Sequence, residues 1–166
     1  MGKDELMEYV DETDKVLGTL PRNKIIEQNK MYRLVAVFVF NGEGKLFIQQ
    51  RSQSNGRYPG YYESSAGGHI VIGESYEQAA YRELYEELGI KDTLKFVGKL
   101  KVEYEGISRF VSLYECLTNK KININKDEVG GGNFLALNEI SVMLKSKEKF
   151  TPVFIELFNR FYMGKK

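Results

Sequence analysis

The chain has 166 residues, of which 42% are hydrophobic and 28% charged, values typical of one globular domain with its own core. A formal net charge of +1 excludes the strongly basic composition of proteins that bind nucleic acid polymers or acidic membranes. The single cysteine, Cys116, excludes an internal disulfide, and no apolar run is long enough to span a bilayer. Because residues 1–8 also lack the pattern of a signal peptide, we expect a cytoplasmic protein with no membrane partner.

The chain is expected to begin with a hairpin. Leu6–Val10 and Val16–Leu20 are predicted strands, and the polar residues 11–14 between them are typical of a turn. Pro21 is suited to the first turn of a short helix, because it fixes the backbone and needs no hydrogen bond there.

The next strands are more apolar. Tyr32–Phe40 is rich in Val and Phe and predicts a buried strand. Residues 41–44, Asn-Gly-Glu-Gly, are a strong hairpin signal, and Leu46–Gln50 is the expected returning strand. Residues 52–62 contain two glycines and a proline, which indicates a loop.

Arginine and tyrosine side chains lie in and beside this loop. Arg51 and Arg57 are suited to phosphate groups, and Tyr62 to a ring of the substrate, so these three are candidate substrate-binding residues. Two plainer interpretations stay open. Loop arginines are often simply exposed, and Tyr61 and Tyr62 could instead pack against the sheet.

A well-marked helix follows. Ser75 is a good N-cap with Gln78 three residues later, the pattern of a capping box, and Gly89 fits the position just after the last turn. Small and apolar residues at helical spacing predict a stripe that faces the core: Ala79, Ala80, Leu84 and Leu88.

The last third of the chain mixes strands and helices. The predicted strands are Leu94–Glu105, Phe110–Leu117 and Phe134–Leu137. We expect Asn138 to cap a short helix over residues 139–144, and Thr151 with Pro152 to begin the final helix. Aromatic and leucine residues of that helix predict core packing: Phe154, Leu157, Phe158 and Phe161.

These elements predict an α+β fold, with a mixed β-sheet flanked by helices and preceded by the N-terminal β-hairpin. No Pro-, Gly- or Ser-rich linker divides the chain. We therefore predict a single domain over residues 1–166, in which residues 1–30 form the hairpin and short helix and residues 31–166 form the core.

Three glutamates of the predicted helix carry the chemistry. Glu83, Glu86 and Glu87 lie three and four residues apart, which brings their side chains onto one helical face where like charges repel. A hard divalent cation such as Mg²⁺ binds oxygen ligands and offsets this repulsion, and it is often shared with substrate phosphates. The plain alternative is a solvated helix face, on which Arg82 and Glu86 would form an ordinary surface pair.

The wider pattern resembles a known family. Gly68, then Glu74, then the run Arg82–Ile90 (Arg-Glu-Leu-Tyr-Glu-Glu-Leu-Gly-Ile) match every fixed position of a Nudix box. The resemblance implies an α/β/α sandwich that hydrolyses a diphosphate joined to another group X. The solvated-face alternative does not account for the glycines, Glu74 and the closing Gly89 occurring together.

The resemblance also implies roles for these residues. In the family the three matching glutamates, here Glu83, Glu86 and Glu87, bind the metal, together with the backbone carbonyl of the glycine that precedes the box, here Gly67. The cofactor would be Mg²⁺ or Mn²⁺.

The remaining roles concern an arginine and a base. Arg82, always cationic, is expected to orient the carboxylates, with Glu74 as its partner. Family members take a general base either from the box, here Glu86 or Glu87, or from a later loop, where Asp127 and Glu128 are the candidates. We favour Glu128, and an exposed acidic turn is the plain alternative.

A looser likeness covers about the first ninety residues. It concerns residues 10–14, 18–19, 37–41 and 49–51, which resemble the Nudix branch that contains type I isopentenyl diphosphate isomerase. This likeness raises a rival reaction, the movement of a double bond in an isoprenoid diphosphate.

The residues of an isomerase site are nevertheless missing. Gly67 stands in place of the catalytic cysteine, and Tyr32 in place of a histidine. Arg109 falls near the position of the catalytic glutamate. The only histidine of the chain, His69, makes a poor metal site alone, and we expect a hydrogen-bonded residue at a strand edge. These departures favour hydrolysis.

The sequence therefore predicts a Mg²⁺-dependent Nudix diphosphohydrolase, with an isomerase-like enzyme and a non-catalytic nucleotide-sensing module as alternatives. The expected partner is a small-molecule diphosphate, not a nucleic acid polymer, and the identity of X is not encoded in the box. A homodimer is compatible with the sequence, through the N-terminal hairpin or the last helix.

Overall fold

The computed structural model describes residues 5–165, so residues 1–4 and 166 of the predicted single domain lie outside it. The strands are β1 (Leu6–Val10), β2 (Val16–Pro21), β3 (Tyr32–Phe40), β4 (Leu46–Arg51), β5 (Tyr62–Glu63), β6 (Ala66–His69), β7 (Lys95–Tyr104), β8 (Ile107–Leu117) and β9 (Val129–Leu135). The helices are α1 (Arg22–Glu27), α2 (Tyr76–Leu88), α3 (Leu137–Lys145) and α4 (Pro152–Phe161). Among the described residues, no helix is long and apolar enough to cross a bilayer.

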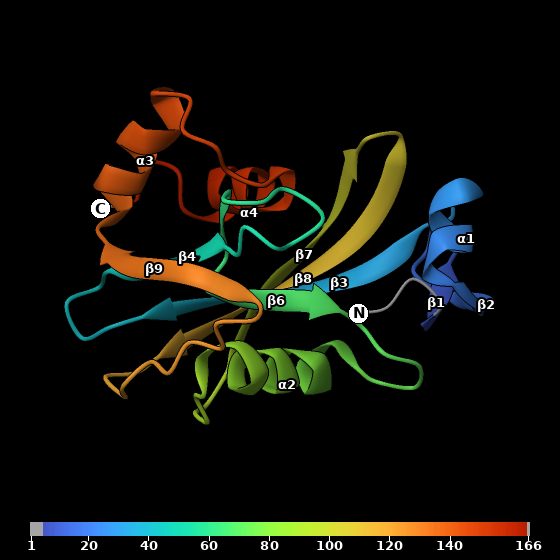
Figure 1. The fold of residues 1–166 in the computed structure, drawn as a ribbon, viewed down its shortest axis with the longest axis horizontal. Helices are drawn as coiled ribbons and strands as arrows, with labels where there is room; N and C mark the ends of the chain where they lie inside the picture. Colours follow the sequence, from blue (N-terminus) through green and yellow to red (C-terminus); the bar gives the residue numbers. More distant parts are fainter. Residues whose placement is uncertain (1–4, 166) are drawn as a thin grey trace.

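The N-terminal hairpin and short helix are confirmed. β1 and β2 pair antiparallel in a sheet of their own, and with α1 they lie at one end of the molecule (Figure 1). A small apolar cluster joins this unit to the core: Met7, Ile25, Tyr32 and Ile107. The hairpin turn is fixed by Asp14, whose carboxylate accepts bonds from Arg33 (2.7 Å) and Lys99 (2.6 Å).

The main sheet is mixed, which confirms the predicted fold class. Its central strand β3 runs parallel to β8 and antiparallel to β4 and β6. β4 meets β3 only at Val39 and Phe40, whereas β6 pairs with the preceding part of β3, from Leu34 to Val37. β4 and β6 thus share one edge of β3 and separate from each other beyond it. The functional groups described below lie around the place where these two strands separate.

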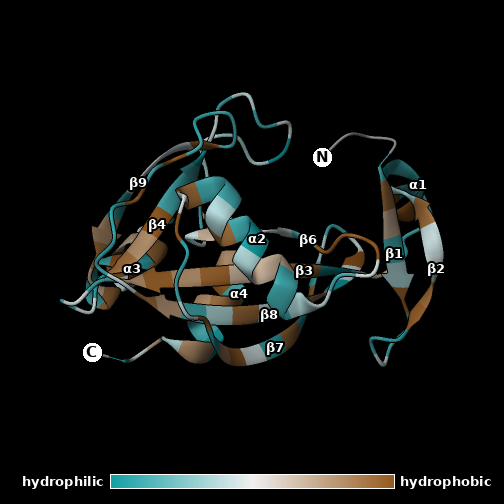
Figure 2. Cartoon of the chain, turned by 90° about the horizontal axis from the view of Figure 1, so that it is seen from below, coloured by the Kyte–Doolittle hydropathy of each residue, from teal (hydrophilic) through white to brown (hydrophobic). Residues whose placement is uncertain are grey.

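Helices cover both faces of the sheet, as expected of a three-layer sandwich (Figures 1 and 2). The stripe of α2 packs on one face, where Ala80, Leu84 and Leu88 are fully buried. On the other face the predicted stripe of α4 packs against Phe38 and its neighbours. Cys116 is fully buried in the α2-side core, in agreement with an inert thiol.

Helix ends agree with the sequence where a cap governs them. Ser75 and Gln78 form the reciprocal bonds of the capping box, and Gly89 adopts a left-handed conformation with φ of 67°. Thr151 accepts a bond from the backbone N–H of Phe154. The short helix predicted over residues 139–144 is confirmed as α3, but its predicted cap was wrong, because the N-cap is Ala136 and Asn138 already lies inside the helix.

Four strands of the core differ from the prediction. β8 begins at Ile107, three residues earlier than predicted, and β5 and β6 were not expected as strands. β9 begins at Val129, five residues earlier than predicted, and contains three glycines. Glycine disfavours strands, but at Gly132 an added Cβ would overlap the Phe47 ring of β4. Close packing between strands therefore selects glycine there and overrides the local preference.

Candidate active site

Three carboxylates converge beside the β6 glycines. Glu83 and Glu87 come from successive turns of α2, and Glu128 comes from the end of the loop before β9. One oxygen of each lies within 4.8 Å of the others. Glu83 and Glu87 are only 7% and 5% exposed, whereas Glu128 is exposed. The arrangement is a half-buried acidic cluster that opens to solvent on the side of Glu128.

Backbone hydrogen bonds bring Glu128 to the helix. The loop runs alongside the C-terminal end of α2, where Asn123 N–H donates to the carbonyl of Leu88 and Asn125 N–H to that of Glu87, both at 2.9 Å. Glu128 N–H then donates to the Asn125 carbonyl at 3.1 Å. The loop thus satisfies carbonyls that the helix leaves free at its end. The same contacts place Glu128 opposite Glu83 and Glu87.

Burial and mutual repulsion act on the acidic groups in the same direction. Burial raises the pKa of Glu83 to about 7, and the carboxylates of Glu86 and Glu128 contribute, against the opposing charge of Arg82. Burial also raises the pKa of Glu87 well above its usual range, with Glu63 and Glu83 adding to the rise. The pKa of Glu63 is raised by burial as well. A cation bound here would remove both penalties.

Glu87 is held on both oxygens. Gly67 N–H donates to one oxygen at 3.0 Å, and the side-chain amide of Gln49 donates to the other. The amide of Gln49 also reaches the carbonyl of Ser65 at 3.2 Å. Its own oxygen is buried and has no hydrogen-bond partner among the described residues. An unpartnered oxygen donor beside a carboxylate cluster fits the chemistry of a hard cation.

Arg82 connects the helix to the loop before it. Its guanidinium donates to both oxygens of Glu74 (2.8 and 3.0 Å), to Glu83 (2.7 Å) and to the carbonyl of His69 (3.0 Å). Burial opposes ionisation of Glu74, but the bonds from Arg82 and from Val71 N–H outweigh it and lower the pKa of Glu74. The arginine therefore has the position of an orienting residue, with Glu74 as its partner.

The structure does not bring Glu86 into the carboxylate cluster. Its side chain is 47% exposed and pairs with Arg82 at 3.2 Å, the surface pair that was the plain alternative for this residue. Asp127 is likewise exposed, and among the described residues it is not part of the cluster. Of the two loop candidates for a general base, only Glu128 faces Glu83 and Glu87.

The candidate substrate-binding residues differ in their surroundings. Arg51 donates to both oxygens of Glu63 (2.9 and 3.1 Å), to Asn55 (2.6 Å) and to the carbonyl of Arg57 (2.9 Å), so most of its donors are engaged within the protein. Tyr62 packs on Phe150, with ring centroids 5.3 Å apart. These contacts favour a structural role for Arg51 and Tyr62.

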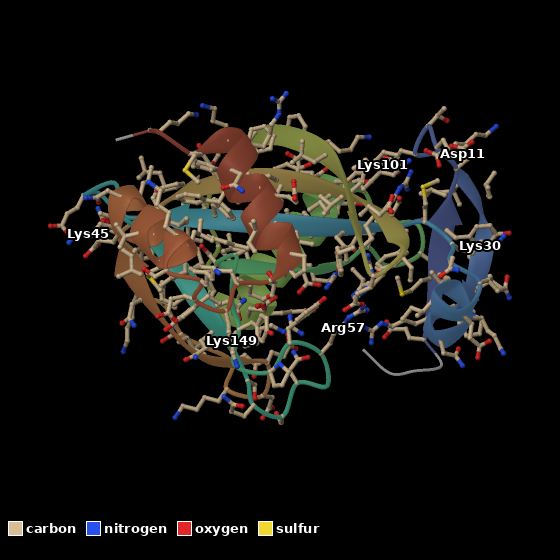
Figure 3. All side chains as sticks on the ribbon, turned by 90° about the horizontal axis from the view of Figure 1, so that it is seen from above. Asp11, Lys30, Lys45, Arg57, Lys101 and Lys149 are labelled. Carbon is tan, nitrogen blue, oxygen red and sulfur yellow. The ribbon has the colours of Figure 1, made fainter. Side chains whose placement is uncertain are left out.

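Arg57 occupies a different position. It pairs with Glu105 and lies on the side of the core that faces the N-terminal unit (Figure 3). It lines a cavity of about 130 Å³ that also includes Glu63, Gly67 and Gly68. The cavity therefore reaches the β6 glycines beside the carboxylates and offers space for part of a substrate.

Sequence reasoning missed two residues at this site, Glu63 and Gln49. Glu63 lies on β5, a two-residue strand without a period of its own, and Gln49 follows the apolar residues Leu46, Phe47 and Ile48 of β4. The signal that was present was polarity in a buried strand: Gln49 is only 1% exposed. A buried amide needs a partner, and here the partner is Glu87.

The family follows from a direct comparison. The family model described as the NUDIX domain matches residues 31–158. The chain belongs to the Nudix family. The match covers the core from β3 to α4 and includes Glu83, Glu87 and Glu128. Nudix hydrolases act on diphosphate-containing substrates, and this membership supports the same for the present chain.

Relatives extend over most of the chain. An uncharacterized Nudix hydrolase of Pseudomonas aeruginosa is 34% identical over 132 residues, 79% of this chain and 78% of the relative. An isopentenyl-diphosphate Delta-isomerase of Pectobacterium atrosepticum is 29% identical over 157 residues, 91% and 88% of the two chains. A crystal structure of a Deinococcus radiodurans protein superposes with a TM-score of 0.86 at 27% identity, covering 95% and 99%. These likenesses confirm the Nudix fold, including the N-terminal unit.

Proposed function

We propose that this Nudix protein hydrolyses a diphosphate linked to a group X, with Mg²⁺ or Mn²⁺ as cofactor and water attacking phosphorus. The observation that carries the proposal is the convergence of Glu83, Glu87 and Glu128 within 4.8 Å. Three carboxylates so close together, two of them buried, are costly without a cation. The unpartnered oxygen of Gln49 beside Glu87 supports the same conclusion.

In this proposal Glu83 and Glu87 hold the metal, with the Gly67 carbonyl as a further ligand, and exposed Glu86 serves a second ion or a water ligand. The bound ion would neutralise the diphosphate and lower the pKa of water. Glu128, the exposed member of the cluster, accepts the proton as the water oxygen bonds to phosphorus and the anhydride bond breaks. Arg82 fixes Glu83 in place.

Two alternatives are less well supported. The relative named as an isomerase favours isomerisation of an isoprenoid diphosphate, but here Tyr32 and Arg109 are buried and bonded to each other. Arg109 also donates to two backbone carbonyls, so it is a structural residue and no acid–base pair stands in that place. A non-catalytic sensing module would not need the full carboxylate set.

A hydrolysis screen tests the proposed function. We expect Mg²⁺- or Mn²⁺-dependent release of a monophosphate from at least one class of nucleotide sugar, dinucleoside polyphosphate, nucleoside triphosphate, coenzyme A or isoprenoid diphosphate. In ¹⁸O-labelled water, mass spectrometry should find the label in one phosphate product. Isopentenyl diphosphate in heavy water should show no deuterium uptake. Tight binding without turnover across the panel would contradict the proposal, and deuterium uptake would favour the isomerase.

Alanine at the two glycines should separate the metal site from the fold. At Gly68 an added Cβ would overlap the carboxylate of Glu83, so Gly68→Ala should weaken Mn²⁺ binding roughly ten- to a hundredfold with a small loss of stability. At Gly67 the added Cβ would lie 2.6 Å from the backbone carbonyl oxygen of Val35, which cannot move freely. Gly67→Ala should therefore lower the melting temperature more than Gly68→Ala does, and it should also weaken Mn²⁺ binding, because the Gly67 N–H holds Glu87.

Calorimetric titration with Mn²⁺ and thermal unfolding distinguish the two glycine variants. Unchanged Mn²⁺ affinity in a folded Gly68→Ala protein would remove Glu83 from the proposed set of ligands.

A further inference from the structure

We propose that the cavity beside the carboxylate cluster binds an anionic oxygen group, a phosphate or a carboxylate, carried by X, and that Arg22 is the residue that selects it. This inference rests on the proposed diphosphate hydrolysis and names a class of substrate for it. Arg22 lines the cavity together with Arg57 and His69. Neither the Nudix box nor the matched region 31–158 includes Arg22.

The cavity lies on the other side of β6 from the carboxylate cluster of Glu83, Glu87 and Glu128. Leu34, Ala36 and Val153 line it, and all three belong to the core on the α4 side of the sheet. Glu83 and Glu87 lie on α2, which covers the opposite face. Both places meet at the two β6 glycines and Glu63. A diphosphate bound at the carboxylates would thus direct X past the glycines into the cavity.

Positive charge in the cavity is in excess. Among the residues that the structure describes, three arginines line it, Arg22, Arg51 and Arg57, against one acidic residue, Glu63. Arg51 is bonded to Glu63, and Arg57 pairs with Glu105 outside the cavity. Arg22 differs, because its Nε is buried and has no hydrogen-bond partner among the described residues. A buried guanidinium donor without a partner is unfavourable, and an anion in the cavity that Arg22 lines would compensate by pairing with the guanidinium charge.

Aromatic rings line the cavity, and a further arginine lies beyond them. The ring of His69 stacks on that of Tyr32, with ring centroids 5.5 Å apart. Tyr104 lines the cavity, and the guanidinium carbon of buried Arg109 lies 3.5 Å from its ring centroid. These positive groups and neutral rings favour an anion over a cation or a neutral group.

The backbone fixes Arg22 in this place. Its N–H donates to the Glu5 carbonyl at 3.0 Å, and α1 is anchored by fully buried Ile25. The N-terminal unit, which lies at one end of the molecule, thereby contributes a residue to the candidate active site (Figure 1). Its role in this proposal is to extend substrate recognition beyond the diphosphate.

Matched substrate pairs that differ by one anionic group test the inference. UDP-glucuronate is compared with UDP-glucose, and coenzyme A with 3′-dephospho-coenzyme A. For at least one pair we expect the anionic member to have a kcat/KM about tenfold or more higher, as one charge-assisted hydrogen bond allows. Arg22→Gln should abolish this preference through KM, so that the anionic member loses more activity than the uncharged member does. Arg22→Lys keeps the positive charge and should therefore keep part of the preference for the anionic substrate.

Lys24→Gln is the matched control, because it removes one positive charge from the exposed face of the same helix. Lys24→Gln should leave the kcat/KM of both members of each pair unchanged. Calorimetric titration in Mg²⁺ with glucuronate 1-phosphate and glucose 1-phosphate, and with coenzyme A and its dephospho form, measures the same preference without turnover.

The outcomes separate the two proposals. Absence of any turnover would contradict the hydrolase, and the titrations would then decide on the cavity alone. Equal binding and equal kcat/KM within both pairs, or an equal loss for both members in Arg22→Gln, would overturn the role of Arg22.

Discussion

Replacing Glu87 with glutamine is expected to lower kcat/KM by about a thousandfold, the size of effect that follows loss of one essential electrostatic group. Glu87 is the most enclosed member of the cluster, with both oxygens held by Gly67 and Gln49. The amide of glutamine has nearly the same shape but cannot neutralise a divalent ion. The fold should survive, because Glu87→Gln also removes a buried charge that Glu63 and Glu83 repel.

Steady-state kinetics and circular dichroism check this prediction on the same samples. Glu77→Gln is the control, since Glu77 is exposed in the first turn of the same helix and away from the cluster. In the absence of metal at pH 8, Glu87→Gln should unfold at a higher temperature than the natural protein. Activity within tenfold of the natural protein would contradict the role proposed for Glu87.

The second large effect concerns stability against pH. The folded protein raises the pKa of Glu83 from about 4.5 to about 7 and raises those of Glu87 and Glu63. Between these values the folded state binds more protons than the unfolded state, so the free energy of unfolding falls as pH rises. In EDTA the melting temperature should therefore drop between pH 5 and pH 8, by about 5 to 10 °C.

Magnesium should reverse this trend, because it binds the deprotonated carboxylates and only the folded state assembles them. At a hundred times its Kd a ligand stabilises by about 2.7 kcal/mol, which is of the order needed to offset the loss. Thermal unfolding at pH 5 and 8, with EDTA or with Mg²⁺, measures the effect, and KCl at equal ionic strength is the control. A Mg²⁺ effect of equal size at both pH values would contradict the assignment.

One helix carries both the proposed metal ligands and residues that pack on the sheet. Glu83 and Glu87 lie on the buried side of α2 beside Leu84 and Leu88, while Glu86 lies on the exposed side. In the proposed function the cation binds where the helix also packs on the sheet. Gly68 of β6 approaches the Glu83 carboxylate closely, so the contact that packs the helix on the sheet also forms part of the candidate site.

Much of the architecture was determined by local sequence. The ends of α2 and α4 could be predicted because Ser75, Gly89 and Thr151 satisfy backbone groups of their own helix. The hairpins followed from their turns, and Glu83 and Glu87 from a four-residue spacing that any helix places on one side. The contact of Arg82 with Glu74 spans only eight residues, so the order of residues alone suggested it.

Only the tertiary structure decided which residues from distant parts of the chain surround Glu83 and Glu87. Gln49 lies 38 residues from Glu87, and β9 contains glycines because β4 approaches it closely. Arg22 reaches the cavity because the N-terminal unit folds back on the core. Such contacts depend on strand pairing and burial between distant segments, and no periodicity in the sequence records them. Local hydrogen bonding thus determined the helices, whereas long-range packing decided which side chains surround the site.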